Sequence, residues 1–150
     1  MQLRFWQKRA PTVGAIEGAA NRALYGDPRL PDFERPRIHV SVDRGGVRLT
    51  GAVSTSKARD LAEWLVAGVP RVTRVRNDLR TDADLTKALQ SALARNPRTA
   101  DLARDSIVFQ GVAELRGRAT YDAQLAATKM ASAIDGVWDV VDHAVWTSAA

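Results

Sequence analysis

The stretch "ALYGDPR" at residues 23–29 returns in altered form as "ALARNPR" at residues 92–98. Each copy ends an apolar stretch with helical spacing, and each carries a proline, which disfavours helical geometry in the residue before it. After a short connection, each copy is followed by a run rich in β-branched residues, "IHV" at 38–40 and "IVF" at 107–109. A helix end followed by a strand, written twice in the same order, indicates an internal duplication.

The duplication extends over most of the chain. A shift of 69 residues superimposes the apolar stripes of two helices, placing Ile16, Ala20, Ala23 and Leu24 on Leu85, Leu89, Ala92 and Leu93. In the first half, "RIHVSVD" and "GGVRLTGAV" alternate as in a hairpin, and a helix and the strand "VTRVRNDL" follow. Within the hairpin, the shift that superimposes the two halves falls from 69 at the first strand to 66 at the second strand, so we expect the second hairpin to be three residues shorter. Each half is predicted to run helix, strand, strand, helix, strand.

Two pairs of motifs carry a family resemblance. They are "GGVRLTGAVSTSKARDLA" with "RVTRVRND" in the first half, and "GVAELRGRAT" with "GVWDVVDHAV" in the second. They resemble BON domains (bacterial osmotically inducible protein and nodulation domain), whose pattern is Gly-Val-x-Leu-x-Gly, a helix, and Gly-Val-x-x-Val-x-Asn. The chain departs from this pattern at Arg71, where glycine is usual, at Asp142, where asparagine is usual, and by one extra residue between Gly111 and Leu115.

The resemblance implies an α+β fold of two tandem αββαβ repeats, each a three-stranded mixed sheet backed by two helices. On this basis we divide the chain into a basic and aromatic N-terminal segment (1–11), a first repeat (12–81), a second repeat (82–147) and a tail (148–150). The resemblance also implies a non-enzymatic role at bacterial envelopes, in which the protein binds anionic phospholipid or supports a membrane assembly.

Composition narrows the function classes. With 45% hydrophobic residues, the chain carries enough apolar material for a folded core. The absence of cysteine excludes disulfides, thiolate zinc sites and cysteine nucleophiles. Lysine and arginine exceed aspartate and glutamate by 22 to 17, which favours an anionic partner. Because Glu17 interrupts the weakly apolar N-terminal run, we expect no export signal and a cytoplasmic protein peripheral to the membrane. The resemblance to BON domains gives the periplasm or cell envelope as the alternative.

Strand alternation predicts a basic outer face on the first sheet. It places five arginines on that face, together with Asp43 and Asp78: Arg37, Arg48, Arg74, Arg76 and Arg80. At about 1 kcal/mol per basic residue near an anionic leaflet, the net charge of this face gives only weak binding. A second membrane signal is expected from Phe5 and Trp6, which are interfacial side chains flanked by basic residues. The alternative is a face that is simply solvated.

The second sheet is predicted to have a more apolar outer face. Alternation places Val108, Gln110, Glu114, Arg116, Val141, His143 and Val145 there. Three valines favour a protein interface, formed with the first repeat, another copy of the chain or a partner protein. Trp64 and Trp138 are further candidates for that interface, because tryptophan is enriched where surfaces are half-buried.

Catalysis is not indicated. His39 and His143 lie in different repeats at no ligand spacing, and no phosphate-binding glycine loop or nucleophile elbow occurs in the sequence. We therefore expect no metal, no cofactor and no small-molecule substrate. The sequence favours a binding and assembly module that contacts anionic phospholipid or a membrane-associated protein. The alternatives are a structural subunit of a larger assembly and, less favoured, a nucleic-acid binder, because the arginine face lacks aromatic residues for base stacking.

Overall fold

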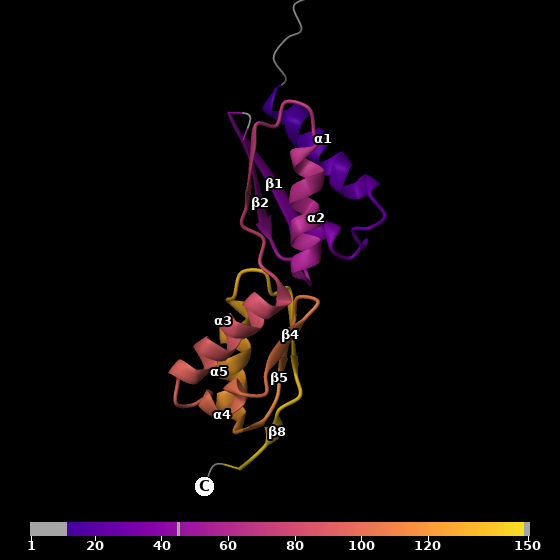
Figure 1. Ribbon diagram of the computed structural model, residues 1–150. Helices are drawn as coiled ribbons and strands as arrows, with labels where there is room; N and C mark the ends of the chain where they lie inside the picture. Colours follow the sequence, from indigo (N-terminus) through magenta and orange to yellow (C-terminus); the bar gives the residue numbers. More distant parts are fainter. Residues whose placement is uncertain (1–11, 45, 149–150) are drawn as a thin grey trace, which may run out of the picture.

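The computed structural model describes residues 12–44 and 46–148. The first repeat contains two helices on the same side of one sheet (Figure 1). Its elements are α1 (Val13–Gly26), the 3-10 helix η2 (Arg35–Arg37), β1 (Ile38–Asp43), β2 (Gly46–Gly51), α2 (Ser56–Ala67) and β3 (Arg74–Asn77).

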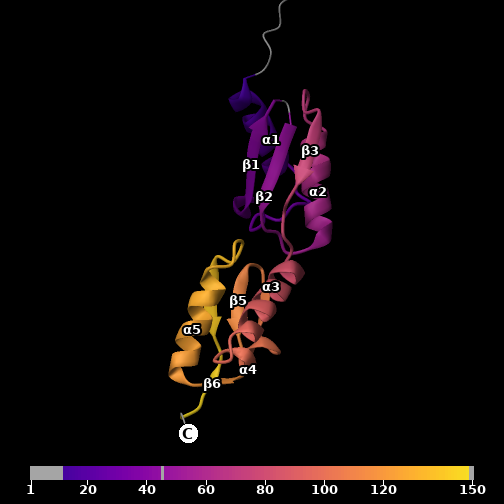
Figure 2. The same cartoon turned by 90° about the vertical axis from the view of Figure 1, so that its left-hand side faces the viewer.

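The second repeat follows the same order with three short additions, α4, β6 and β8. Its elements are α3 (Asp82–Arg95), α4 (Ala100–Ala103), β4 (Ile107–Phe109), β5 (Val112–Leu115), β6 (Arg118–Ala119), α5 (Tyr121–Ser132), β7 (Asp139–Asp142) and β8 (Val145–Trp146). The helices of the second repeat lie on the side of the molecule opposite to those of the first, so the outer faces of the two sheets point in opposite directions (Figures 1 and 2).

Both sheets have the same mixed topology. In the order β1-β2-β3, the first pair is antiparallel and the second pair is parallel, and the order β4-β5-β7 repeats this arrangement. The pair β6 and β8 extends β5 and β7 in an unchanged register, since Leu115 faces Asp142 and Arg118 faces Val145. The α+β fold of two tandem αββαβ repeats is confirmed.

Each repeat has its own hydrophobic core, which the helical stripes of the sequence supply. Leu24, Leu49 and Val66 are almost fully buried in the first, and Leu89 and Leu115 in the second. Helices α1, α2, α3 and α5 begin at threonines whose side-chain oxygens accept a backbone N–H three residues further on, which satisfies a donor that a helix start leaves unpaired. These caps are Thr12, Thr55, Thr81 and Thr120.

The second hairpin is shorter, as expected: its strands β4 and β5 contain three and four residues, against six in each of β1 and β2. The turns of the two hairpins, however, have the same length. Val42 faces Val47 in the first, and Val108 faces Ala113 in the second, which is the same spacing. With the turns aligned, Ile107 corresponds to Ser41 and not to Ile38, so the three missing residues belong to the start of the first strand. A shift by an odd number of residues moves every strand side chain to the other face. The prediction that Val108 faces outward is therefore wrong: this residue is 5% exposed and belongs to the second core.

The repeats are stacked end to end and contact each other directly (Figure 2). Ala52 of the first repeat is 1% exposed and packs into the core of the second. At Gly136 an added Cβ would lie 3.1 Å from Ala52 and 3.1 Å from Leu85, so only glycine permits this approach. Arg80 donates through Nη1 to the carbonyl oxygen of Asp135 at 3.1 Å. The junction is thus a packed contact with little free space.

Candidate functional site

The outer face of the first sheet brings together three of the five predicted arginines. Ser41, Arg48 and Arg76 form one cross-strand row, and Arg74 lies in the adjoining row beside Gly46. The three arginines are exposed to solvent. Their guanidinium groups therefore lie on neighbouring strands of one surface, where each can reach an anionic ligand.

Asp78 neutralises part of this surface. Its carboxylate accepts from Arg48 Nε at 2.7 Å and pairs with Arg76 Nε at 2.9 Å. The hydrogen bond from Arg48, supported by that from Arg76, lowers the pKa of Asp78 below its ordinary value. Asp78 consequently remains ionised at neutral pH. Within the described part of the chain, Arg74 has no such ion pair.

Two further arginines lie at the same end of the sheet and were not singled out by strand alternation. Because β1 and β2 are antiparallel and β2 and β3 are parallel, the β1–β2 turn meets the connection into β3 at one end. Arg44 lies in that turn and Arg71 in that connection, and both are exposed. Helix α1 also begins at this end (Figure 1). The predicted order of strands could have identified these two residues, because a third strand parallel to the second places its preceding connection beside the hairpin turn.

We call this surface the basic end, and it comprises Arg44, Arg48, Arg71, Arg74 and Arg76. With Asp43 and Asp78 beside these five arginines, its net charge is +3. The two remaining predicted arginines, Arg37 and Arg80, lie elsewhere.

Arg37 is not on the exposed face, and that prediction is wrong. Its side chain is only 12% exposed and lies between two carboxylates, 3.5 Å from Glu34 and 3.8 Å from Asp82. The reason is local: Arg37 ends the 3-10 helix η2, so the alternation of β1 does not extend to it. Arg80 is half-buried at the junction of the repeats, where it contacts Asp135. Both residues join the two repeats.

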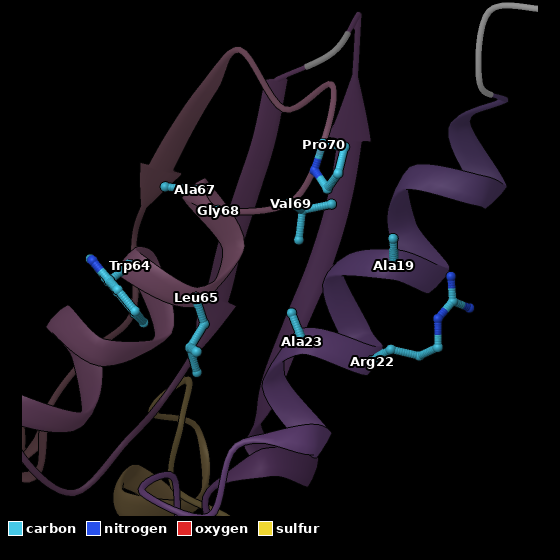
Figure 3. A pocket seen from close by; sticks show the side chains of 9 residues that line it. All are labelled: Ala19, Arg22, Ala23, Trp64, Leu65, Ala67, Gly68, Val69 and Pro70. Carbon is cyan, nitrogen blue, oxygen red and sulfur yellow. The ribbon is translucent and has the colours of Figure 1, made fainter. Parts of the chain in front are cut away.

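A groove of about 600 Å³ lies between α1 and α2 of the first repeat. Figure 3 shows Trp64 and Leu65 on one side of it and Ala19 and Ala23 on the other. Trp64 is 64% exposed, and the guanidinium carbon of Arg29 lies 5.2 Å from the centre of its ring. The small residues leave room for an apolar side chain, which agrees with the prediction that Trp64 lies at an interface but does not test it.

The outer face of the second sheet is apolar. Val141 and Val145 lie on it, as alternation predicts, and Phe109 joins them in place of Val108, with 58% of its surface exposed. We call this surface the apolar face, and its apolar members are Ile107, Phe109, Val112, Val141 and Val145.

The aromatic candidates have different environments. Trp138 is 66% exposed, and its Nε1 donates to the carbonyl oxygen of Gln110 at 2.8 Å, which ties the indole to the β4–β5 turn. Phe5 and Trp6 lie outside the described residues. Among the described helices, none has the length and apolar character required to cross a bilayer. Over the same residues, no group of three or more potential metal ligands is found.

Comparison with known proteins agrees with this architecture. Two solved structures of CdsD, a structural protein of the type III secretion system of Chlamydia trachomatis, share the fold. One is 14% identical with a TM-score of 0.56, and the match covers 86% of this chain and 59% of that chain. The other, its C-terminal domain, is 20% identical with a TM-score of 0.58, over 90% and 67% of the two chains. A comparison with curated protein sequences finds no match.

The BON domain family model matches the chain twice, at residues 12–83 and 81–148. The two matches coincide with the two αββαβ units, and together they cover all of the described residues. Membership of this family supports a role in binding or assembly. The chain belongs to the BON domain family and contains two BON domains in tandem.

Proposed function

We propose that this tandem BON protein is a non-enzymatic module that contacts an anionic phospholipid surface through the basic end of its first repeat. The observation that carries the proposal is the convergence of five exposed arginines from β2, β3 and two adjacent connections. Phosphate and carboxylate groups of lipid headgroups are suitable acceptors for guanidinium donors.

Charge alone gives a weak contact. At about 1 kcal/mol per net basic residue, a charge of +3 contributes about 3 kcal/mol, whereas millimolar affinity requires about 4 kcal/mol. An apolar contribution is needed for stable binding. Phe5 and Trp6 precede α1 by a few residues, and α1 begins at the basic end, so these aromatic side chains are proposed to insert beside the arginines (Figure 1).

Reversing two charges of the basic end should strongly weaken binding to anionic vesicles. Arg74→Glu combined with Arg76→Glu changes the net charge of this surface from +3 to −1, so affinity is expected to fall at least about tenfold. The measurement is co-sedimentation of the full chain with phosphatidylserine vesicles, and with phosphatidylcholine vesicles as the uncharged reference.

A matched control separates local from overall charge. Lys87→Glu combined with Arg104→Glu makes the same change in net charge on exposed residues of the second repeat and should leave vesicle binding nearly unchanged. Equal losses in both double variants would contradict a localised site. A wild-type chain that binds double-stranded DNA but neither vesicle would favour the nucleic-acid alternative, and binding to none of the three would favour the structural-subunit alternative.

A further inference from the structure

The apolar face of the second repeat carries its charges in a graded order. Along the sheet, the first row contains Asp139 and the last row contains Arg118. Between these rows, Glu114 and Arg116 form an ion pair with each other, so their charges cancel. Exposed apolar side chains lie at both ends, since Phe109 is in the first row and Val145 is in the last. The face therefore carries an acidic residue at one end, a basic residue at the other, and an exposed apolar side chain beside each of them.

In the first repeat, the corresponding patch of the sheet is covered by the second repeat. There, Ala52 and Arg80 face each other and contact the turn at Asp135 and Gly136 of the second repeat. The equivalent pair in the second repeat is Arg118 and Val145, which are both exposed, with Val145 at 61%. The second repeat thus leaves exposed the patch that, in the first repeat, forms the contact between the two repeats.

A second copy cannot cover this patch by repeating the junction between the repeats. Such head-to-tail stacking would place Arg71 in the position of Gly136, and Arg118 in the position of Ala52. At the existing junction a Cβ at Gly136 would be crowded, because it would lie 3.1 Å from Ala52, and the φ of 102° at this position favours glycine. Two arginines would also meet at this contact. Any association of copies must therefore use another geometry.

We propose that the apolar face binds the same face of a second copy, with the strands of the two copies running in opposite directions. A two-fold axis between the sheets then brings Asp139 of one copy onto Arg118 of the other copy. Phe109 of each copy covers the region of Val145 in the other. With the strands in the same direction, Asp139 would meet Asp139 of the other copy, and Arg118 would meet Arg118. The order of charges along the face therefore selects the antiparallel arrangement.

This arrangement is compatible with the rest of the molecule. The outer faces of the two sheets point to opposite sides, so both basic ends stay exposed in the dimer (Figure 1). A contact of two three-stranded sheets is at the small end of specific interfaces, and the dimer is expected to dissociate at concentrations of about 10 to 100 µM.

A charge swap tests the proposal in sedimentation equilibrium of the full chain over a concentration series. Asp139→Arg should weaken dimerisation at least about tenfold, because Asp139 faces Arg118 of the other copy in the proposed dimer. Arg118→Asp should weaken it by a similar factor. The double variant with both changes should restore the dimer, a result that misfolding cannot produce. Asp43→Arg makes the same charge change on the first sheet and should have no effect.

Two results would overturn the inference: a wild-type chain that is monomeric at every concentration, or a dimer whose affinity neither single variant changes. Failure of the double variant to recover the affinity lost in both single variants would also count against the antiparallel arrangement. The experiment contains no lipid, so its outcome is independent of the membrane proposal.

Discussion

Replacing Gly51 by alanine is expected to lower the free energy of unfolding of the first repeat by about 3 kcal/mol or more. Gly51 has a φ of 106°, which side chains with a Cβ rarely adopt. An added Cβ would also lie 2.0 Å from the carbonyl oxygen of Arg37, which is backbone and cannot rotate away. The measurement is urea unfolding followed by circular dichroism, with separate transitions fitted for the two repeats because each has its own core.

Gly117 provides the matched control, because it ends the same motif in the second repeat. Its φ is 125°, but the nearest backbone atom to an added Cβ, the carbonyl oxygen of Asp101, is 3.0 Å away. Gly117→Ala is therefore expected to lose only about 1 to 2 kcal/mol from the second transition. Equal losses at the two glycines, or a loss at Gly51 below that at Gly117, would contradict the geometry of the first hairpin.

Removing the Glu34 carboxylate should also destabilise the chain strongly. Glu34 is 2% exposed, and each of its carboxylate oxygens accepts the backbone N–H of Ser54 at 3.0 Å. The same carboxylate balances the buried charge of Arg37. Breaking a buried ion pair by removing one partner costs about 3 to 5 kcal/mol, so Glu34→Ala is expected to lose about 3 kcal/mol in the urea experiment.

A neutral pair of similar size separates the charge from the packing. Glu34→Gln combined with Arg37→Met removes both charges and keeps an acceptor for Ser54, so it should lose less than Glu34→Ala alone. A change of less than about 1 kcal/mol for Glu34→Ala would contradict a buried pair that holds η2 in place, because so small a loss is typical of exposed ion pairs.

The duplication and the helices could be predicted from the sequence, because both depend on spacing alone. Apolar residues such as Leu85, Leu89 and Leu93 recur at helical intervals, and each is fully buried. The topology followed from the family resemblance, which was recognised because two imperfect motifs occurred twice in the same order.

The faces of the second sheet were harder to predict. The run "IVF" at 107–109 is apolar at every position, so alternation cannot show which of its residues face the core. Aligning Ile107 with Ile38, which places the three-residue deletion in the turn instead of at the start of the strand, inverted the faces, and with them Val108 and Phe109. The residues of one strand do not show that the turns of the two hairpins have the same length.

The candidate binding site was predicted only in part, for a different reason. Strand alternation found Arg48, Arg74 and Arg76, because it applies inside strands. It cannot place residues in turns, such as Arg44 and Arg71, and it fails where a strand is preceded by a 3-10 helix, as at Arg37. The contacts between the repeats depend on how two domains stack, which no local pattern in the sequence describes.

The measurement that tests the membrane proposal most directly is hydrogen–deuterium exchange of the full chain with and without phosphatidylserine vesicles. We predict slower exchange in peptides that cover the β1–β2 turn and residues 68–74, with no change in the second repeat at concentrations below dimerisation. Exchange slowed only in the second repeat, or unchanged throughout the chain, would contradict a membrane contact at the basic end.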